Sequence, residues 1–169
     1  MKNFICILLI TLHCQVFGVA VPAESFKQAL QHVINSATKS KFSDIQGEKF
    51  ETLKKGNNVI EKYQTIDSLP GSVQNYIQIS FARSFRSVLF SSTEITDEMK
   101  DMFNLYSGLV KQCTPECWWF VAEVTHPDGN YKSLSASRKQ KSEVNVYPDI
   151  NLEIVKKNGM YVLQLSVNI

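Results

Sequence analysis

The stretch that decides the fold is the C-terminal segment INLEIVKKNGMYVLQLSVNI, residues 150–169. Apolar residues alternate with polar ones on both sides of KKNG, which supplies turn residues. The alternating apolar positions are Ile150, Leu152 and Ile154 before the turn, and Tyr161, Leu163, Leu165, Val167 and Ile169 after it. A period of two places one set of side chains on one face of a strand. The segment therefore predicts an antiparallel hairpin with one buried face.

Further runs upstream have the composition of strands. They are residues 48–54 (EKFETLK), 57–66 (NNVIEKYQTI), 73–82 (VQNYIQISFA) and 86–92 (RSVLFSS), and another begins at residue 118. Gly56 and the LPGS segment, residues 69–72, supply turns between them. Residues 125–142, THPDGNYKSLSASRKQKS, are polar and contain a Pro-Asp-Gly group. We interpret them as a long loop or an irregular hairpin.

Two segments have the periodicity of amphipathic helices. In residues 23–40, AESFKQALQHVINSATKS, apolar side chains share one face, and Ser25 and Gln28 have capping-box spacing. In residues 96–113, TDEMKDMFNLYSGLVKQC, Thr96 is the expected N-cap and the two acidic residues after it suit the positive end of a helix. Each apolar stripe must pack on something, and core packing is the expected role of both.

In chain order these elements predict an α+β fold with the order α-β-β-β-β-α-β-β-β. Helices and runs of strands are separated along the chain, which indicates a largely antiparallel sheet with the two amphipathic helices packed on one face. Each half begins with a helix and continues with strands, so two α-β repeats within one sheet are a further possibility. No internal sequence repeat supports that possibility.

The first 20 residues, MKNFICILLITLHCQVFGVA, have the features of a secretory signal peptide. Their apolar run is far shorter than the roughly 20 residues that a membrane-spanning helix needs. Cleavage after Ala20 leaves residues 21–169 as a single α+β domain, secreted or periplasmic, with no transmembrane segment. Acylation of Cys14 is the less favoured alternative, because His13 stands where a small residue is expected.

Two cysteines remain beyond this segment, Cys113 and Cys117, on either side of the turn-forming Pro115. In an extended chain their Cα atoms would be about 13 Å apart, whereas one helical turn brings them to roughly 6 Å, within disulfide range. Export to an oxidising compartment then favours a disulfide at the end of a helix. The alternatives are a redox pair, which needs C-x-x-C spacing, and a zinc site, which needs further ligands.

Catalytic patterns are scarce in the chain. It contains no G-x-S-x-G, no H-E-x-x-H and no nucleotide-binding glycine pattern, and we expect no metal and no cofactor. His126 and Asp128 lie two residues apart in a Pro-Gly turn, where backbone hydrogen bonding is the commoner role. A net charge of +2 over 169 residues gives no argument for nucleic acid as a partner.

Several features occur together along the chain: the signal peptide, the first amphipathic helix, the segment FSDIQGEKFE (residues 42–51), the LPGS turn, a helix that ends in cysteine, and the closing hairpin. This combination resembles the short exported hypothetical proteins that are common in Bacteroidota. The resemblance implies an exported α+β fold, and it transfers no catalytic residue.

The remaining signals concern binding. Trp118 and Trp119 are adjacent, so in a strand they point to opposite faces and a single core cannot take both. An exposed tryptophan is a common anchor of protein interfaces. Arg138, Lys139 and Lys141 form a short basic run that could meet an acidic partner, with a solvated loop as the alternative. We predict an exported, non-enzymatic module that binds an unknown protein or envelope component.

The alternative function is a small secreted hydrolase or ligand carrier with its site near the 125–142 segment, where His126 and Asp128 would act. Two further charges, Arg83 and Arg86, lie around Phe85. We interpret them as charges that keep an edge strand soluble.

Overall fold

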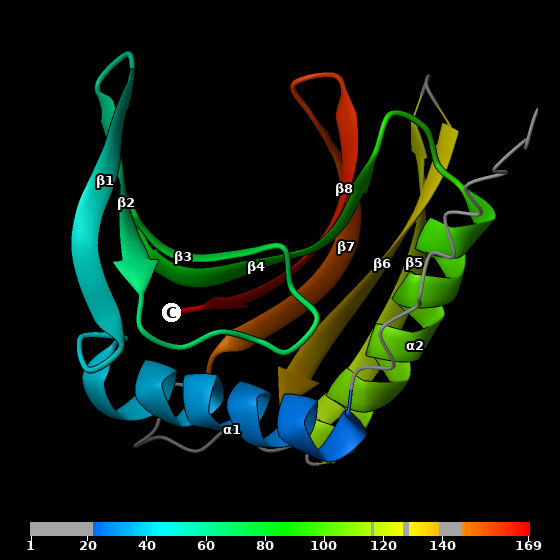
Figure 1. The fold of residues 1–169 in the computed structure, drawn as a ribbon, viewed down its shortest axis with the longest axis horizontal. Helices are drawn as coiled ribbons and strands as arrows, with labels where there is room; N and C mark the ends of the chain where they lie inside the picture. Colours follow the sequence, from blue (N-terminus) through cyan, green and yellow to red (C-terminus); the bar gives the residue numbers. More distant parts are fainter. Residues whose placement is uncertain (1–21, 116, 127–128, 139–146) are drawn as a thin grey trace, which may run out of the picture.

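The computed structural model describes residues 22–115, 117–126, 129–138 and 147–169 (Figure 1). The first half of the chain holds one helix and four strands: α1 (Ala23–Ser40), β1 (Gln46–Lys55), β2 (Asn58–Thr65), β3 (Gln74–Ile79) and β4 (Arg83–Ser92). The second half repeats that order: α2 (Asp97–Cys113), β5 (Cys117–His126), β6 (Gly129–Arg138), β7 (Asp149–Lys157) and β8 (Met160–Asn168). The described chain is therefore mainly a sheet with two helices.

All eight strands form one antiparallel sheet in the order β1-β2-β3-β4-β8-β7-β6-β5. Each half contributes four consecutive strands, and the halves meet where β4 pairs with β8. At this junction Phe85 lies opposite Val167, and both side chains are fully buried. The arrangement has the two-repeat form that the element order raised as a possibility.

The predicted fold is wrong as stated, although the broad α+β class fits. The expected order had three strands after the second helix, whereas the structure has four. The missed strand is β6, which occupies most of the 125–142 segment that we interpreted as a loop or irregular hairpin. It pairs with β5 on one side and β7 on the other, so its backbone hydrogen bonds come from both neighbours. Leu134, a lone apolar side chain in a polar run, is fully buried.

The closing hairpin forms where the alternation indicates, but the expectation of one buried face is wrong for β8, which is buried on both faces from Tyr161 to Val167. Strands β7 and β8 pair from Asp149 opposite Asn168 to Lys157 opposite Met160. Asn158 and Gly159 connect them, with φ angles of 51° and 81°. Two residues with positive φ match the twist of the flanking strands, which is why Asn-Gly favours this tight turn.

The helices begin for different local reasons. In α2, the Thr96 side chain accepts a hydrogen bond from the backbone N–H of Met99 at 3.1 Å, so the expected N-cap is confirmed. The capping box expected at Ser25 is wrong. Helix α1 already begins at Ala23, with Pro22 in the N-cap position and no side-chain hydrogen bond there. Proline suits the start of a helix because it has no backbone N–H that would be left unpaired.

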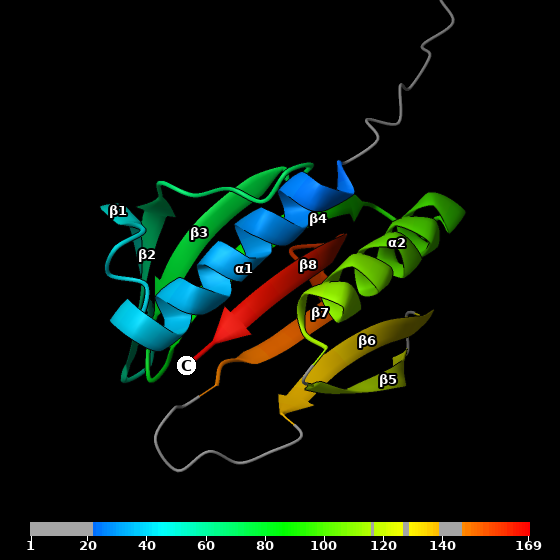
Figure 2. The same cartoon turned by 90° about the horizontal axis from the view of Figure 1, so that it is seen from below.

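Both helices lie on the same face of the sheet (Figures 1 and 2). Helix α1 contacts β8, and α2 contacts β4 and β7, so each helix packs against a strand of the other half. Between the helices, the rings of Phe26 and Tyr106 lie 5.1 Å apart and are fully buried. The buried apolar side chains of both halves belong to one core cluster.

Candidate functional site

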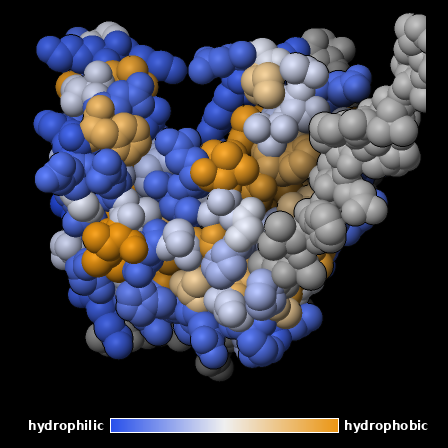
Figure 3. All heavy atoms as spheres, in the orientation of Figure 1, coloured by the Kyte–Doolittle hydropathy of each residue, from blue (hydrophilic) through white to orange (hydrophobic). Residues whose placement is uncertain are grey.

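The sheet face opposite the two helices is the candidate binding surface. No other described element lies over it, and the sheet curves so that this face lines a hollow between the β1–β2 and β7–β8 hairpins (Figures 1 and 3). We call this surface the inner face. Its central side chains are Phe50, Glu51, Lys62, Tyr76, Arg86, Glu153, Lys157 and Gln164.

Strand register determines which side chains reach the inner face. In β4 and β8, Phe85 and Leu165 are buried on the helix side, so their neighbours Arg86 and Gln164 point the other way. Arg86 lies opposite Tyr76 of β3. Gln164 lies opposite Glu153 of β7. Polar and aromatic side chains therefore cross the centre of the sheet in two adjacent rows, because Arg86 lies opposite Ser166 and Gln164 lies opposite Val88.

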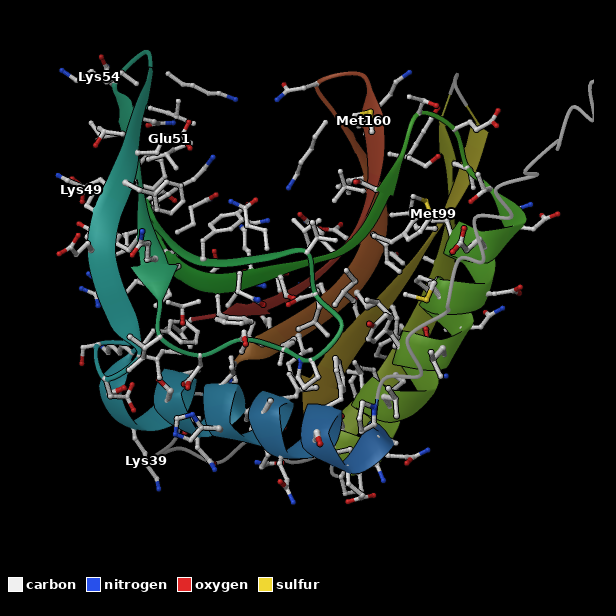
Figure 4. The ribbon with its side chains drawn as sticks, viewed as in Figure 1. Lys39, Lys49, Glu51, Lys54, Met99 and Met160 are labelled. Carbon is white, nitrogen blue, oxygen red and sulfur yellow. The ribbon has the colours of Figure 1, made fainter. Side chains whose placement is uncertain are left out.

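An ion pair and two aromatic rings form the wall on the β1–β2 side. The Lys62 ammonium lies 2.6 Å from the Glu51 carboxylate and 5.5 Å from the centre of the Tyr76 ring. The Phe50 ring meets Tyr76 edge-on at 6.4 Å, yet Phe50 stays 45% exposed. Figure 4 shows Glu51 on the side of β1 that faces the hollow and Lys49 on the opposite side. This wall combines a neutralised charge with accessible apolar surface.

A chain of hydrogen bonds forms the wall on the β7–β8 side. The Lys157 ammonium donates to the Gln164 side-chain oxygen, and the Gln164 amide donates to the Glu153 carboxylate at 2.6 Å. Partial burial of the amine lowers the pKa of Lys157, and the positive charges of Arg86 and Lys62 lower it further, while Glu153 opposes the change. The cations of the inner face are therefore close enough to repel one another.

Arg86 lies between the two walls and is half-buried. Its Nε donates to the Ser84 hydroxyl at 3.2 Å. Among the side chains that the structure describes, no carboxylate forms an ion pair with it. A guanidinium has five N–H donors in a planar fork, so the terminal nitrogens of Arg86 can still donate to a ligand.

The pH dependence of stability tests the crowding of cations around Lys157. Because folding lowers the pKa of Lys157 from its ordinary 10.5, the folded protein loses this proton before the unfolded chain does. The free energy of unfolding therefore rises with pH between the lowered pKa and 10.5, and the charge costs stability at neutral pH. We expect Lys157→Gln to raise stability at pH 7 by less than about 1 kcal/mol, since Lys157 is exposed enough for solvent to screen its charge.

Urea unfolding of both proteins at pH 7 and at pH 10 measures this effect. The advantage of the Lys157→Gln variant should shrink at the higher pH, where the wild-type amine is partly neutral. An advantage of wild type that is equal at both pH values would contradict the crowding of positive charge on the inner face.

The residues predicted for binding lie at the other end of the sheet. Trp118 and Trp119 both belong to β5, the edge strand, where they pair with Ser137 and Ala136. Trp119 is half-buried and packs against the core. The side chain of Trp118 lies outside the described residues, so its predicted exposure stays a prediction.

The predicted basic run is described only in part. Arg138 is the last residue of β6, opposite Cys117, and its side chain is outside the described part of the chain. Lys139 and Lys141 lie outside the described residues altogether. Strand pairing places the backbone of Arg138 next to the position opposite Trp118, and whether the rest of the run joins them stays a prediction.

The cysteine turn has the backbone geometry that the spacing indicates. Helix α2 ends at Cys113, and the N–H of Cys117 donates to the Thr114 carbonyl at 3.0 Å before β5 begins. No disulfide joins Cys113 and Cys117 in the structure, so the disulfide stays a prediction. Burial raises the pKa of Cys113 to about 11; the positive charge of Lys27 acts in the opposite direction, and the negative charge of Glu24 adds to the increase. A thiol with so high a pKa is a poor nucleophile at neutral pH.

The site that the alternative function requires lies partly outside the described residues. His126 ends strand β5, and Asp128 lies outside the described residues, so their pairing stays untested. The long loop on which that function depended is mostly strand β6. His32 lies on α1, 61% exposed, with Nδ1 2.8 Å from the Asp67 carboxylate. That contact ties α1 to the segment after β2.

In the described part of the chain, no helix is long and apolar enough to cross a membrane. No group of three or more His, Cys, Asp or Glu side chains there is arranged to hold a metal ion.

Arg86 is the site residue that sequence reasoning misjudged. We interpreted it, with Arg83, as a charge on an edge strand, but β4 is a central strand paired on both sides. A charge in the middle of a sheet has no role in keeping an edge soluble, and it needs a charged or polar partner. The signal available in the sequence was that Arg86 directly follows Phe85, which is buried in the structure. In a strand, two consecutive side chains point to opposite faces.

No family model, no curated protein and no solved structure matches the chain. The resemblance to exported Bacteroidota proteins therefore stays a prediction. The functional argument rests on the inner face itself.

Proposed function

We propose that this protein is an exported, non-enzymatic binding module that holds a protein partner on its inner face. The observation that carries the proposal is the inner face, which no other described element covers, with Arg86 at its centre between two hydrogen-bonded walls. Export is supported by the signal-peptide features of residues 1–20, which lie outside the described residues.

The chemistry of the inner face is that of an interface. Arginine and tyrosine are enriched among the residues that dominate binding energy in protein complexes. Tyr76 is 7% exposed and is therefore held in place by its neighbours. Phe50 is 45% exposed, so part of its apolar surface is accessible to a partner. Polar and charged side chains around them can orient a partner, as in the polar rim of an interface.

The scaffold also suits recognition, because it holds these side chains in fixed positions. Gln164 and Ser166 of β8 are 2% and 3% exposed although their side chains lie on the inner face. Gln164 is hydrogen-bonded on both sides, to Lys157 and to Glu153. A preorganised surface loses less conformational entropy when a partner binds.

Blocking the inner face tests the function. Gln78 of β3 lies opposite Lys62 and Ser84, so Gln78→Trp places a bulky ring on the inner face without changing the net charge or Arg86. Thr52→Trp is the matched control, because Thr52 is exposed and lies opposite Glu61 on the other face of the sheet. Tryptophan is well tolerated in strands, so both variants should fold.

The measurement is affinity capture from the envelope and culture fluid of the source, with the chain from Val21 to Ile169 as bait and mass spectrometry as readout. We expect a partner that wild type and Thr52→Trp retain and that Gln78→Trp loses. Circular dichroism and thermal unfolding check that the baits are equally folded. A partner retained equally by all three baits would contradict binding at the inner face.

A further inference from the structure

We propose that the partner presents an aspartate or glutamate side chain, and that its carboxylate binds to the Arg86 guanidinium at the centre of the inner face. This inference rests on the proposed function and names the chemistry of the partner. The ligand is a protein segment in which the acidic residue has an apolar neighbour.

The charges of the inner face leave Arg86 as the unmatched group. Lys62 is neutralised by Glu51 at 2.6 Å. Lys157 and Glu153 share Gln164 as a hydrogen-bonding bridge. Arg86 donates only to the neutral Ser84 hydroxyl among the described side chains. The face therefore lacks one negative charge at its centre.

The geometry of arginine favours a carboxylate as the missing group. The two parallel N–H bonds of a guanidinium match the two oxygens of a carboxylate, which makes the pair directional as well as strong. Here Nε is held by Ser84, and this bond restrains the side chain while the terminal nitrogens stay available. Lys157 and Lys62 act electrostatically at the same place, because the positive charges of Arg86 and Lys62 both disfavour the charged form of Lys157. An arriving carboxylate would relieve that repulsion.

Two carboxylates on the walls argue against a long polyanion. A nucleic acid strand carries a phosphate about every 3.4 Å along the helix axis, so several phosphates would meet the inner face together. Glu51 and Glu153, on β1 and β7 at opposite sides of Arg86, already engage the neighbouring cations, Glu51 directly and Glu153 through Gln164, so among the described side chains no unpaired cation is left there for neighbouring phosphates. A single carboxylate fits between them.

The apolar component of the ligand follows from Phe50. This ring is 45% exposed beside Tyr76, on the β1–β2 wall. Burying its exposed area under an apolar side chain of the partner would be favourable. A segment with an acidic residue beside an apolar one therefore matches both the charge and the surface of the inner face.

Panning a library of random displayed peptides against the chain from Val21 to Ile169 tests the inference without a known partner. We expect enrichment of peptides that carry Asp or Glu beside an aromatic or aliphatic residue. The most enriched peptide is then synthesised with a fluorophore, and its affinity is measured by fluorescence anisotropy.

Three variants define the role of Arg86. Arg86→Gln should weaken peptide binding by about 10- to 100-fold, because it removes a charge-assisted hydrogen bond. Arg86→Lys keeps the charge but not the planar fork, so its loss should be intermediate. Lys39→Gln removes the same charge from the last turn of α1, far from the hollow in Figure 4, and should leave the affinity unchanged.

The possible outcomes separate this inference from the proposed function. Acidic peptides lost on Arg86→Gln, in a variant that unfolds at the wild-type temperature, would support it. Peptides that Gln78→Trp excludes, but that lack acidic residues or ignore Arg86→Gln, would overturn the carboxylate inference and leave the binding function standing. Absence of enrichment, or peptides indifferent to Gln78→Trp, would overturn both. Tighter binding of a fluorescent oligothymidylate, lost on Arg86→Gln, would overturn the protein ligand in favour of nucleic acid.

Discussion

Replacing Phe26 by alanine is expected to lower the free energy of unfolding by about 3–5 kcal/mol. Phe26 is fully buried on α1, and its ring lies 5.1 Å from that of Tyr106 on α2. The substitution removes a large apolar surface from the core and leaves a cavity where the helices of the two halves meet. Because α1 packs on β8 and α2 on β4, the substitution destabilises both halves of the sheet.

Urea denaturation followed by circular dichroism measures this change. Phe81→Ala is the matched control, since Phe81 in the turn between β3 and β4 is 88% exposed. The control should change the unfolding free energy by no more than about 0.5 kcal/mol. If the two variants were equally stable, the contact between α1 and α2 would not be part of the core. Unfolding in two separate steps would likewise contradict a shared core.

Replacing Leu134 by alanine is expected to lower the free energy of unfolding by about 2–5 kcal/mol. Leu134 is fully buried although it lies in the polar segment that we interpreted as a loop or irregular hairpin. In β6 it pairs with Val121 of β5 and Leu152 of β7. Truncating it removes apolar contacts at the centre of the three outermost strands of the second half.

The same denaturation experiment decides between strand and loop. Leu105→Ala provides the control, because Leu105 is 48% exposed on α2 and the substitution is chemically identical. Its effect should stay below about 1 kcal/mol. A loss for Leu134→Ala no larger than that of the control would restore the loop interpretation and remove β6 from the core.

The parts of the fold that were predictable have strong local patterns. The hairpin of β7 and β8 combines a largely alternating apolar pattern with an Asn-Gly turn, and both features act within a few residues. Thr96 marks the start of α2, because its side chain accepts a hydrogen bond from the Met99 N–H. Such signals depend on short stretches of chain, so they can be read without the tertiary structure.

Strand β6 could not be predicted in this way. It is rich in serine and has one buried apolar residue, Leu134, among its described side chains. Its pairing with β5 and β7 supplies backbone hydrogen bonds on both sides. Its own sequence pattern does not indicate this pairing. Context of this kind commonly outweighs intrinsic strand preference.

By itself, the sequence determined the two amphipathic helices, the closing hairpin, the helix end at Cys113 and the broad α+β class. These depend on periodicity, capping and turn residues, which operate over one or two turns of chain. Only the tertiary structure decided the candidate site. Lys62, Arg86 and Lys157 come from β2, β4 and β7, and no spacing along the chain brings them together. Strand order and antiparallel register bring all three side chains to the face turned away from the helices, because alternation assigns faces only once the neighbouring strands are known.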